Sequence, residues 1–212
     1  MTKGQIIETR NSLVRFNYRV LIQYVILCNV KKISNYNTNM IFNLKIFLNI
    51  LLFSSGPQDL PASSNLLKLI IIINLIIGLM AVDPNIDITV NIFFALIYIF
   101  VTLLFIRICL NIKDKANQGT NYSSRYVQVC NGTLGVHAIV ALITNLMTMI
   151  ISTTGEPLLI TFLIISLYAW FVNGHIFRNA FDTNMTIGLG FSLLHSMVCV
   201  IFMMLFIQVL TP

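Results

Sequence analysis

Charged side chains are scarce in this 212-residue sequence: 9% of its residues are Asp, Glu, Lys or Arg, whereas 57% are hydrophobic. A soluble domain carries roughly 25% charged residues, because its surface must be hydrated. A chain with so few charges does not have enough polar surface to cover a core of this size in water. The composition therefore excludes an ordinary soluble domain and indicates a protein embedded in a lipid bilayer.

The sequence also lacks the short motifs that carry chemistry. It contains no Walker loop, no GxSxG and no HExxH, and its four cysteines show no CxxC spacing. Most of the net charge of +6 comes from the first forty residues, and no basic patch with interleaved aromatic residues follows them. We therefore expect a protein that is not an enzyme, has no metal site and does not bind nucleic acid. Its cysteines are expected to serve as small apolar residues.

What the sequence does contain is five long apolar runs. They cover residues 66–82, 88–112, 127–150, 157–180 and 184–210. A helix rises 1.5 Å per residue, so about 20 residues cross a hydrocarbon core of roughly 30 Å. Helices satisfy their own backbone hydrogen bonds, as the bilayer requires. The runs predict an all-α helical membrane protein, with a transmembrane domain of about five helices over residues 66–210.

The chain before the first run divides into two parts. Residues 1–39 form a basic extension of different composition, and we expect translation to start at Met40; a basic arm at the membrane surface is the alternative. Residues 41–53 carry polar side chains on one side and predict a short amphipathic helix lying in the membrane interface. Two prolines and a glycine in residues 54–64 forbid a continuous helix. We therefore expect residues 40–65 to form an interfacial helix followed by an elbow.

Basic residues mark one side of the membrane. Seven basic residues follow Met40. All of them lie on the side of the membrane that holds loops 113–126 and 177–183, or within a turn or two of that side. Loops 83–88 and 151–156 carry acidic residues and no Lys or Arg. The positive-inside bias places the basic side in the cytoplasm. Five spans then predict a cytoplasmic N-terminus and a C-terminus outside.

Polar side chains inside the runs are the first place to look for function in a membrane protein. Asn74, His137 and His195 lie in three different runs at a similar depth, about ten residues or 15 Å from the cytoplasmic end. We expect them to face one another as an intramembrane polar site. The site has three interpretations: hydrogen bonds that hold the helices together, a proton or substrate pathway, or a pair of axial ligands for haem b. We expect no cofactor, because the small residues nearby indicate tight packing.

That packing is predicted from Gly188, Ser192 and Ser196, which recur every four residues. Such a ladder lets helix backbones approach closely. We expect it to pack against run 127–150 and to bring His195 near His137.

A second set of polar residues lies nearer the cytoplasmic surface. It consists of Arg107, His175 and Arg178, and Arg107 and His175 are at matching depths. The two arginines are expected to snorkel to lipid headgroups rather than to do chemistry.

Two segments carry a resemblance to known proteins: Gly56-Pro57-Gln58-Asp59-Leu60-Pro61, and the stretch containing Trp170, Gly174-His175-Ile176 and Arg178. Together they resemble an uncharacterised family of small multi-span inner-membrane proteins of proteobacteria, from Met40 onward. The five-span plan also loosely resembles the Yip family of membrane proteins. The first resemblance implies a bacterial inner-membrane location, and neither implies an activity.

Two hypotheses for function follow. The first is a non-enzymatic protein that binds and organises other membrane proteins or further copies of itself within the lipid bilayer. Short loops and small-residue faces favour it. The second is a small transporter or channel subunit that uses the polar layer at His137 and His195.

Overall fold

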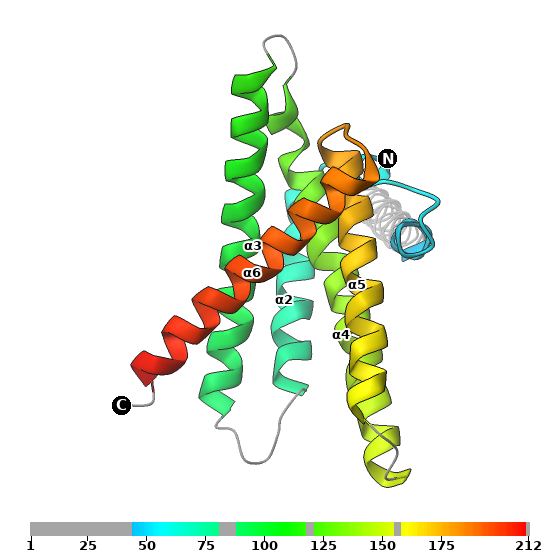
Figure 1. The fold of residues 1–212 in the computed structure, drawn as a ribbon, viewed down its shortest axis with the longest axis vertical. Coiled ribbons are helices and arrows are strands. Elements are labelled where there is room, and N and C mark those ends of the chain that lie inside the picture. The colour runs from blue at the N-terminus through cyan, green and yellow to red at the C-terminus, as the bar shows by residue number, and fades with distance from the viewer. Residues whose placement is uncertain (1–43, 81–87, 118–120, 155–157, 211–212) are drawn as a thin grey trace, which may run out of the picture. The chain divides into compact units, whose positions relative to one another are not determined.

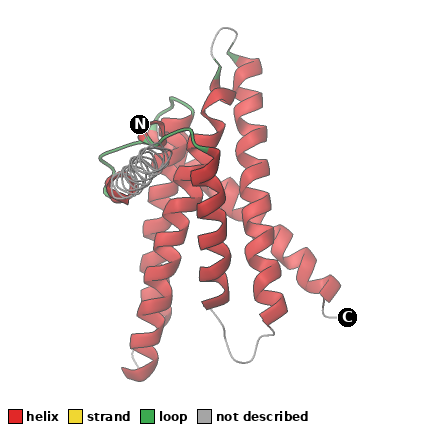
Figure 2. Cartoon of the chain, turned by 180° about the vertical axis from the view of Figure 1, so that it is seen from behind, coloured by secondary structure: helices red, strands yellow, loops and turns green. Residues whose placement is uncertain are grey.

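The computed structural model describes residues 44–80, 88–117, 121–154 and 158–210, and these are helical without strands (Figure 2). The all-α prediction is confirmed. The extension of residues 1–39 and the expected start at Met40 lie outside the described residues. Five long helices follow one another along the chain (Figure 1): α2 (Ser64–Met80), α3 (Ile88–Ala116), α4 (Tyr126–Thr154), α5 (Leu158–Ala180) and α6 (Met185–Leu210). Two short 3-10 helices precede α2 and α4: η1 (Pro57–Asp59) and η2 (Tyr122–Arg125).

Four of these helices are long and apolar enough to cross a membrane, namely α3, α4, α5 and α6. The prediction of a helical membrane protein is therefore confirmed. Helix α2 has 17 residues, which corresponds to about 26 Å. That length is at the lower limit for a spanning helix, so the number of spans is four or five.

The helices pack in a different order from the one the sequence suggested. Helix α6 packs most extensively on α5 and also contacts α3, while α4 packs on α2 and α5. The expected pairing of run 127–150 with run 184–210, which are α4 and α6, is therefore wrong. Close approach of α6 to α5 uses the small residues that were expected to face α4.

The main core lies in the half of the bundle that contains the basic loops. Its fully buried side chains come mainly from α3, α4, α5 and the segment before α2, and include Ile50, Ile106, Leu134, Val172 and Phe177. The opposite half is more open, and α6 diverges from α5 there (Figure 1). The bundle is therefore tight where its loops are basic and loose at the far end.

The elbow before α2 is part of this core rather than a free linker. Residues 44–51 are helical, and from this helix Phe47 and Ile50 are buried while Leu48 is exposed. Phe47 packs over Gly135 of α4, where an added Cβ would lie 2.3 Å from the Phe47 ring. Gly135 thus leaves the space into which this aromatic side chain fits.

Polar side chains of α4 and α5 hold the elbow in place through its carbonyl oxygens. Gln128 Nε2 donates to the oxygens of Leu60 at 2.8 Å and Gln58 at 3.1 Å. His175 Nε2 donates to the oxygen of Ser55 at 2.9 Å. A turn rich in proline and glycine leaves carbonyls without helical partners, and these side chains satisfy them.

Candidate functional site

The first part of the predicted polar site is a pair formed by Asn74 of α2 and His137 of α4. Asn74 Nδ2 donates to the carbonyl oxygens of Ile70, at 2.8 Å, and Leu134, at 3.0 Å. Both hydrogens of the amide are then used, so its oxygen must be the group that meets His137 Nδ1 at 3.0 Å. A carbonyl oxygen only accepts, so the proton of the neutral imidazole is on Nδ1. Nε2 of His137 is left with its lone pair.

The second part centres on His195 of α6, which is 2% exposed. Its Nε2 lies 3.0 Å from the hydroxyl of Thr102 on α3 and 3.5 Å from the thiol sulfur of Cys199, one turn along α6. The rings of Phe105 and Phe177 pack around it, with centroids 5.1 and 5.9 Å away. His195 is thus a hydrogen-bonded histidine in an aromatic environment.

Tyr98 of α3 touches both histidines. Its ring stacks on that of His137, with centroids 3.9 Å apart, and meets His195 edge-on at 6.0 Å. The structure therefore brings Asn74, His137 and His195 into one layer, but as two hydrogen-bonded groups joined by an aromatic ring. Tyr98 and Thr102 were not among the predicted site residues, which came from the first, third and fifth runs.

The two histidines do not fit axial ligation of one haem. Tyr98 contacts both imidazoles and occupies the space in which a macrocycle would have to lie. Nε2 of His195, moreover, is held by Thr102. The geometry favours polar contacts between helices over a haem site.

A cavity of about 290 Å³ adjoins the His137 half of the layer. Helices α2, α3, α4 and α6 surround it, and its polar lining consists of Asn74, Asn91, Tyr98, His137 and Asn145. Phe94 and Met203 are among its apolar walls. Asn91 was not among the predicted site residues, although the sequence shows it as an amide near the start of the apolar run of α3.

The residues expected near the cytoplasmic surface are not gathered into one site. Arg107 lies over the ring of Tyr126, with its guanidinium carbon 5.3 Å from the ring centroid. Arg178 is exposed beside Gly188. His175 bonds to the elbow. Each has a separate local role, and the two arginines end at the surface.

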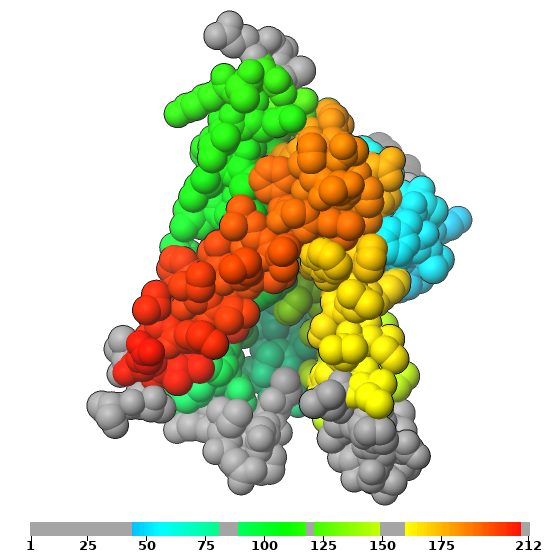
Figure 3. Space-filling view, viewed as in Figure 1, coloured from blue at the N-terminus to red at the C-terminus, as the bar shows by residue number. Residues whose placement is uncertain are grey.

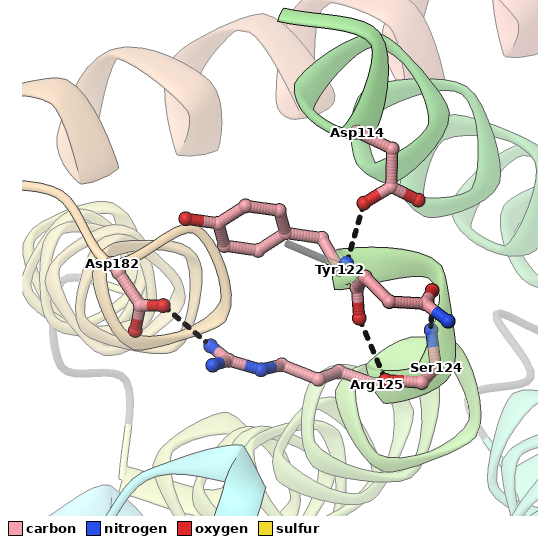
Figure 4. A network of polar contacts seen from close by, with 6 residues as sticks. Asp114, Tyr122, Ser124, Arg125 and Asp182 are labelled. Atoms are coloured by element: carbon pink, nitrogen blue, oxygen red, sulfur yellow. Dashed lines mark hydrogen bonds and ion pairs between the residues drawn. The ribbon is translucent and has the colours of Figure 1, made fainter. Parts of the chain in front are cut away.

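The loop between α3 and α4 carries a polar network that the sequence analysis did not anticipate (Figure 4). The carboxylate of Asp114 accepts the backbone N–H groups of Tyr122 and Ser123 and also the hydroxyl of Ser123. Arg125 reaches across to Asp182, in the turn between α5 and α6, with an N–O distance of 2.9 Å. This network fixes η2 against α3 and ties the α3–α4 and α5–α6 connections together. The only signal in the sequence was one acidic residue in an otherwise basic loop.

The predicted packing residues of α6 do form a helix contact, but with α5. Ser192 Oγ donates to the carbonyl oxygen of Trp170 at 3.0 Å, and Trp170 Nε1 donates back to the oxygen of Leu189 at 3.2 Å. Ser196 bonds to the carbonyl of Ser192 within its own helix. Gly188 and Ser192 are therefore used inside the bundle, whereas Ser196 is exposed and the prediction that it packs against another helix is wrong.

Comparison with protein-family models, curated proteins and solved structures finds no match. Function must therefore be inferred from the residues of this chain. The features that can support such an inference are the polar layer, the cavity beside it and the surfaces that the helices leave exposed.

Proposed function

We propose that this chain is a non-enzymatic multi-pass protein of the bacterial inner membrane, and that it binds other membrane proteins through α6. The observation that carries this proposal is the exposure of the C-terminal half of α6 next to a groove. In the most apolar 18-residue stretch of α6, only 17% is buried, against 28% in the corresponding stretch of α5 and 50% in that of α4.

The exposed half of α6 is large, apolar and deformable. Ile201, Met204 and Leu205 are 52%, 60% and 54% exposed. Together with Phe202 and Phe206 they cover several sides of the helix. Methionine adapts its shape to different partners, which suits a surface that contacts another protein.

The groove gives a reason to expect a helix rather than lipid alone on this surface. Figure 3 shows a hollow between α6 and α5, with α2 and α4 behind it. Association of helices in a bilayer depends on van der Waals packing, because lipid is as apolar as the side chains. A helix seated between α5 and α6 contacts the surfaces of both helices, whereas a helix on a convex surface contacts a single surface.

The proposed membrane and orientation rest on the charges and on the resemblance to bacterial inner-membrane proteins. The basic residues Lys68, Lys113, Lys115, Arg125 and Arg178 belong to the ends of helices that meet on one side. The positive-inside bias favours a cytoplasmic location for that side. With α2 as a fifth span, the N-terminus is cytoplasmic and the C-terminus outside.

The transport hypothesis has one observation in its favour, the cavity beside His137. Against it, His195 is enclosed by Phe105 and Phe177 and does not line that cavity. Replacing His137 and His195 together with neutral residues separates the two hypotheses. If the double variant loses transport activity but still assembles, the transport hypothesis is favoured. If it keeps both, the binding role is favoured.

Photocrosslinking in native membranes tests the α6 proposal. A photoreactive residue at Met204 is expected to give a discrete adduct of higher mass, either with another membrane protein or with a second copy. Phe100 of α3 is the matched control, because it is also an exposed apolar residue, 62% accessible, on a different helix. Adducts with lipid alone at Met204, or the same protein adduct at both sites, would refute the proposal.

A further inference from the structure

The cavity beside His137 has a chemistry that the binding role of α6 does not use. We propose that it is a binding site for a small neutral molecule that carries a hydroxyl group on an apolar body. Among the described residues, three features carry the inference: an acceptor and a donor that both lack a partner, a lining without charge, and apolar walls of suitable size.

The acceptor is Nε2 of His137. Asn74 fixes the proton on Nδ1, because both of its amide hydrogens are already bonded to backbone oxygens. No described group donates to Nε2, although His137 lines the cavity. Turning the ring over by half a turn would keep its stacking on Tyr98 but would break the hydrogen bond between Nδ1 and Asn74.

The donor is the side-chain amide of Asn91. Its Nδ2 is buried and has no hydrogen-bond partner among the described residues. Asn91 also lines the cavity. Buried amides in native structures are nearly always bonded, so an orphaned donor on a side chain that lines a cavity points to a partner that belongs there. Asn145 adds an amide that makes one long bond, 3.4 Å, to the oxygen of Ile77.

These groups select the ligand by charge and by hydrogen bonding. Among the described residues, the side chains that line the cavity include no Lys, Arg, Asp or Glu. An ion would therefore lose its hydration without gaining a counter-charge. A hydroxyl matches both unsatisfied groups at once: it donates to Nε2 of His137 and accepts from Nδ2 of Asn91.

The remaining walls favour an apolar body on that hydroxyl. Phe94, Ile99 and Met203 line the same cavity, which at about 290 Å³ is near the lower end of small-molecule sites. A fused pair of aromatic rings or a short branched alcohol is of suitable size. Such a molecule dissolves in the bilayer and can reach the bundle from the hydrocarbon phase.

Binding of 1-naphthol, compared with naphthalene, tests the proposal with the full chain in lipid nanodiscs. Equilibrium dialysis against protein-free nanodiscs removes the contribution of partitioning into lipid. We expect saturable binding of 1-naphthol, and affinity for naphthalene weaker by about tenfold, the scale of one hydrogen bond.

Two variants locate the site. Asn91→Leu removes the unpaired donor at similar volume and should weaken 1-naphthol binding by about tenfold while leaving naphthalene unchanged. Asn173→Leu is the control, because Asn173 also has a buried unpaired side-chain atom, Oδ1, but does not line the cavity. Its binding should equal that of the unmodified protein.

Ala141→Leu provides a steric test that keeps every polar group. Ala141 lines the cavity on α4, so the larger side chain fills part of it. We expect binding of both probes to be lost, and this variant also decides the question if Asn91→Leu fails to fold. Equal binding of the two probes, or unchanged binding in Ala141→Leu, would refute the site.

Discussion

Gly174 and Gly188 bring the backbones of α5 and α6 into direct contact. A Cβ added at Gly188 would lie 2.3 Å from the carbonyl oxygen of Gly174, and one added at Gly174 would lie 2.7 Å from the side chain of Leu189. Neither position has room for a side chain. The crossing of these two helices therefore depends on glycine at both positions.

Replacing Gly188 with leucine should separate α5 from α6 and lower the stability of the bundle. The cost is expected at about 1–3 kcal/mol, as for overpacking a core, and more if the hydrogen bonds between Ser192 and Trp170 are also lost. Thermal unfolding in detergent measures it. Gly190→Leu is the matched control on the same helix, because no neighbouring atom lies within 4 Å of a Cβ there. Equal melting temperatures for the two variants would contradict this packing.

Asn74 should contribute more to stability than His137, although they share a hydrogen bond. Asn74→Leu removes three hydrogen bonds and leaves Nδ1 of His137 without a partner. His137→Phe removes one of them and can keep the stacking on Tyr98. Intramembrane hydrogen bonds are worth about 0.6 kcal/mol on average, so we expect a clear difference in unfolding free energy.

Thr144→Val is a control for that comparison. Its hydroxyl bonds at 2.8 Å to the oxygen of Val140, one turn back in α4, and so joins no two helices. Its melting temperature should stay close to that of the unmodified protein. A greater loss of stability in His137→Phe than in Asn74→Leu would contradict the role assigned to Asn74.

The sequence predicted the fold class well because length and hydropathy alone decide whether a helix can span a bilayer. It predicted the neighbours of each helix poorly. Gly188 and Ser192 were correctly identified as a surface for close packing, but spacing along one helix does not say which other helix carries the matching glycine. That glycine is Gly174, in the fourth run, and only the structure pairs the two.

The candidate site was predicted in part for a similar reason. Depth along a helix placed Asn74, His137 and His195 in one layer, because depth follows from a rise of 1.5 Å per residue. The orientation of each face around its helix axis does not follow from depth. The contacts of Tyr98 with both histidines, and the position of the cavity beside His137, depend on that orientation. Neither could therefore be predicted from the sequence.

Asp114 should control the local order of η2. Asp114→Asn keeps the size of the side chain but removes the charge that accepts the N–H groups of Tyr122 and Ser123. We expect faster amide hydrogen exchange over η2, since these amides lose a strong acceptor at the start of a helix.

Asp182→Asn is the comparison for that variant. It disrupts the ion pair with Arg125, whose side chain is 35% exposed while that of Asp182 is 54% exposed. Exposed ion pairs contribute little to stability, so exchange over η2 should change less. Equal effects of the two variants would show that Asp114 does not organise this helix.

The membrane orientation can be tested independently of all these contacts. Helices α3 to α6 are long and apolar enough to cross a bilayer, and α2, with 17 residues, decides whether the number of spans is odd or even. We expect α2 to cross as well, because it packs along α3 and α4 and its inner residue Asn74 bonds to the backbone of α4. An enzymatic reporter fused at Pro212 should then be active outside, and one inserted near Gln118 should be active in the cytoplasm. Cytoplasmic activity from the fusion at Pro212 would show that α2 does not span and that the four longer helices return the chain to its starting side.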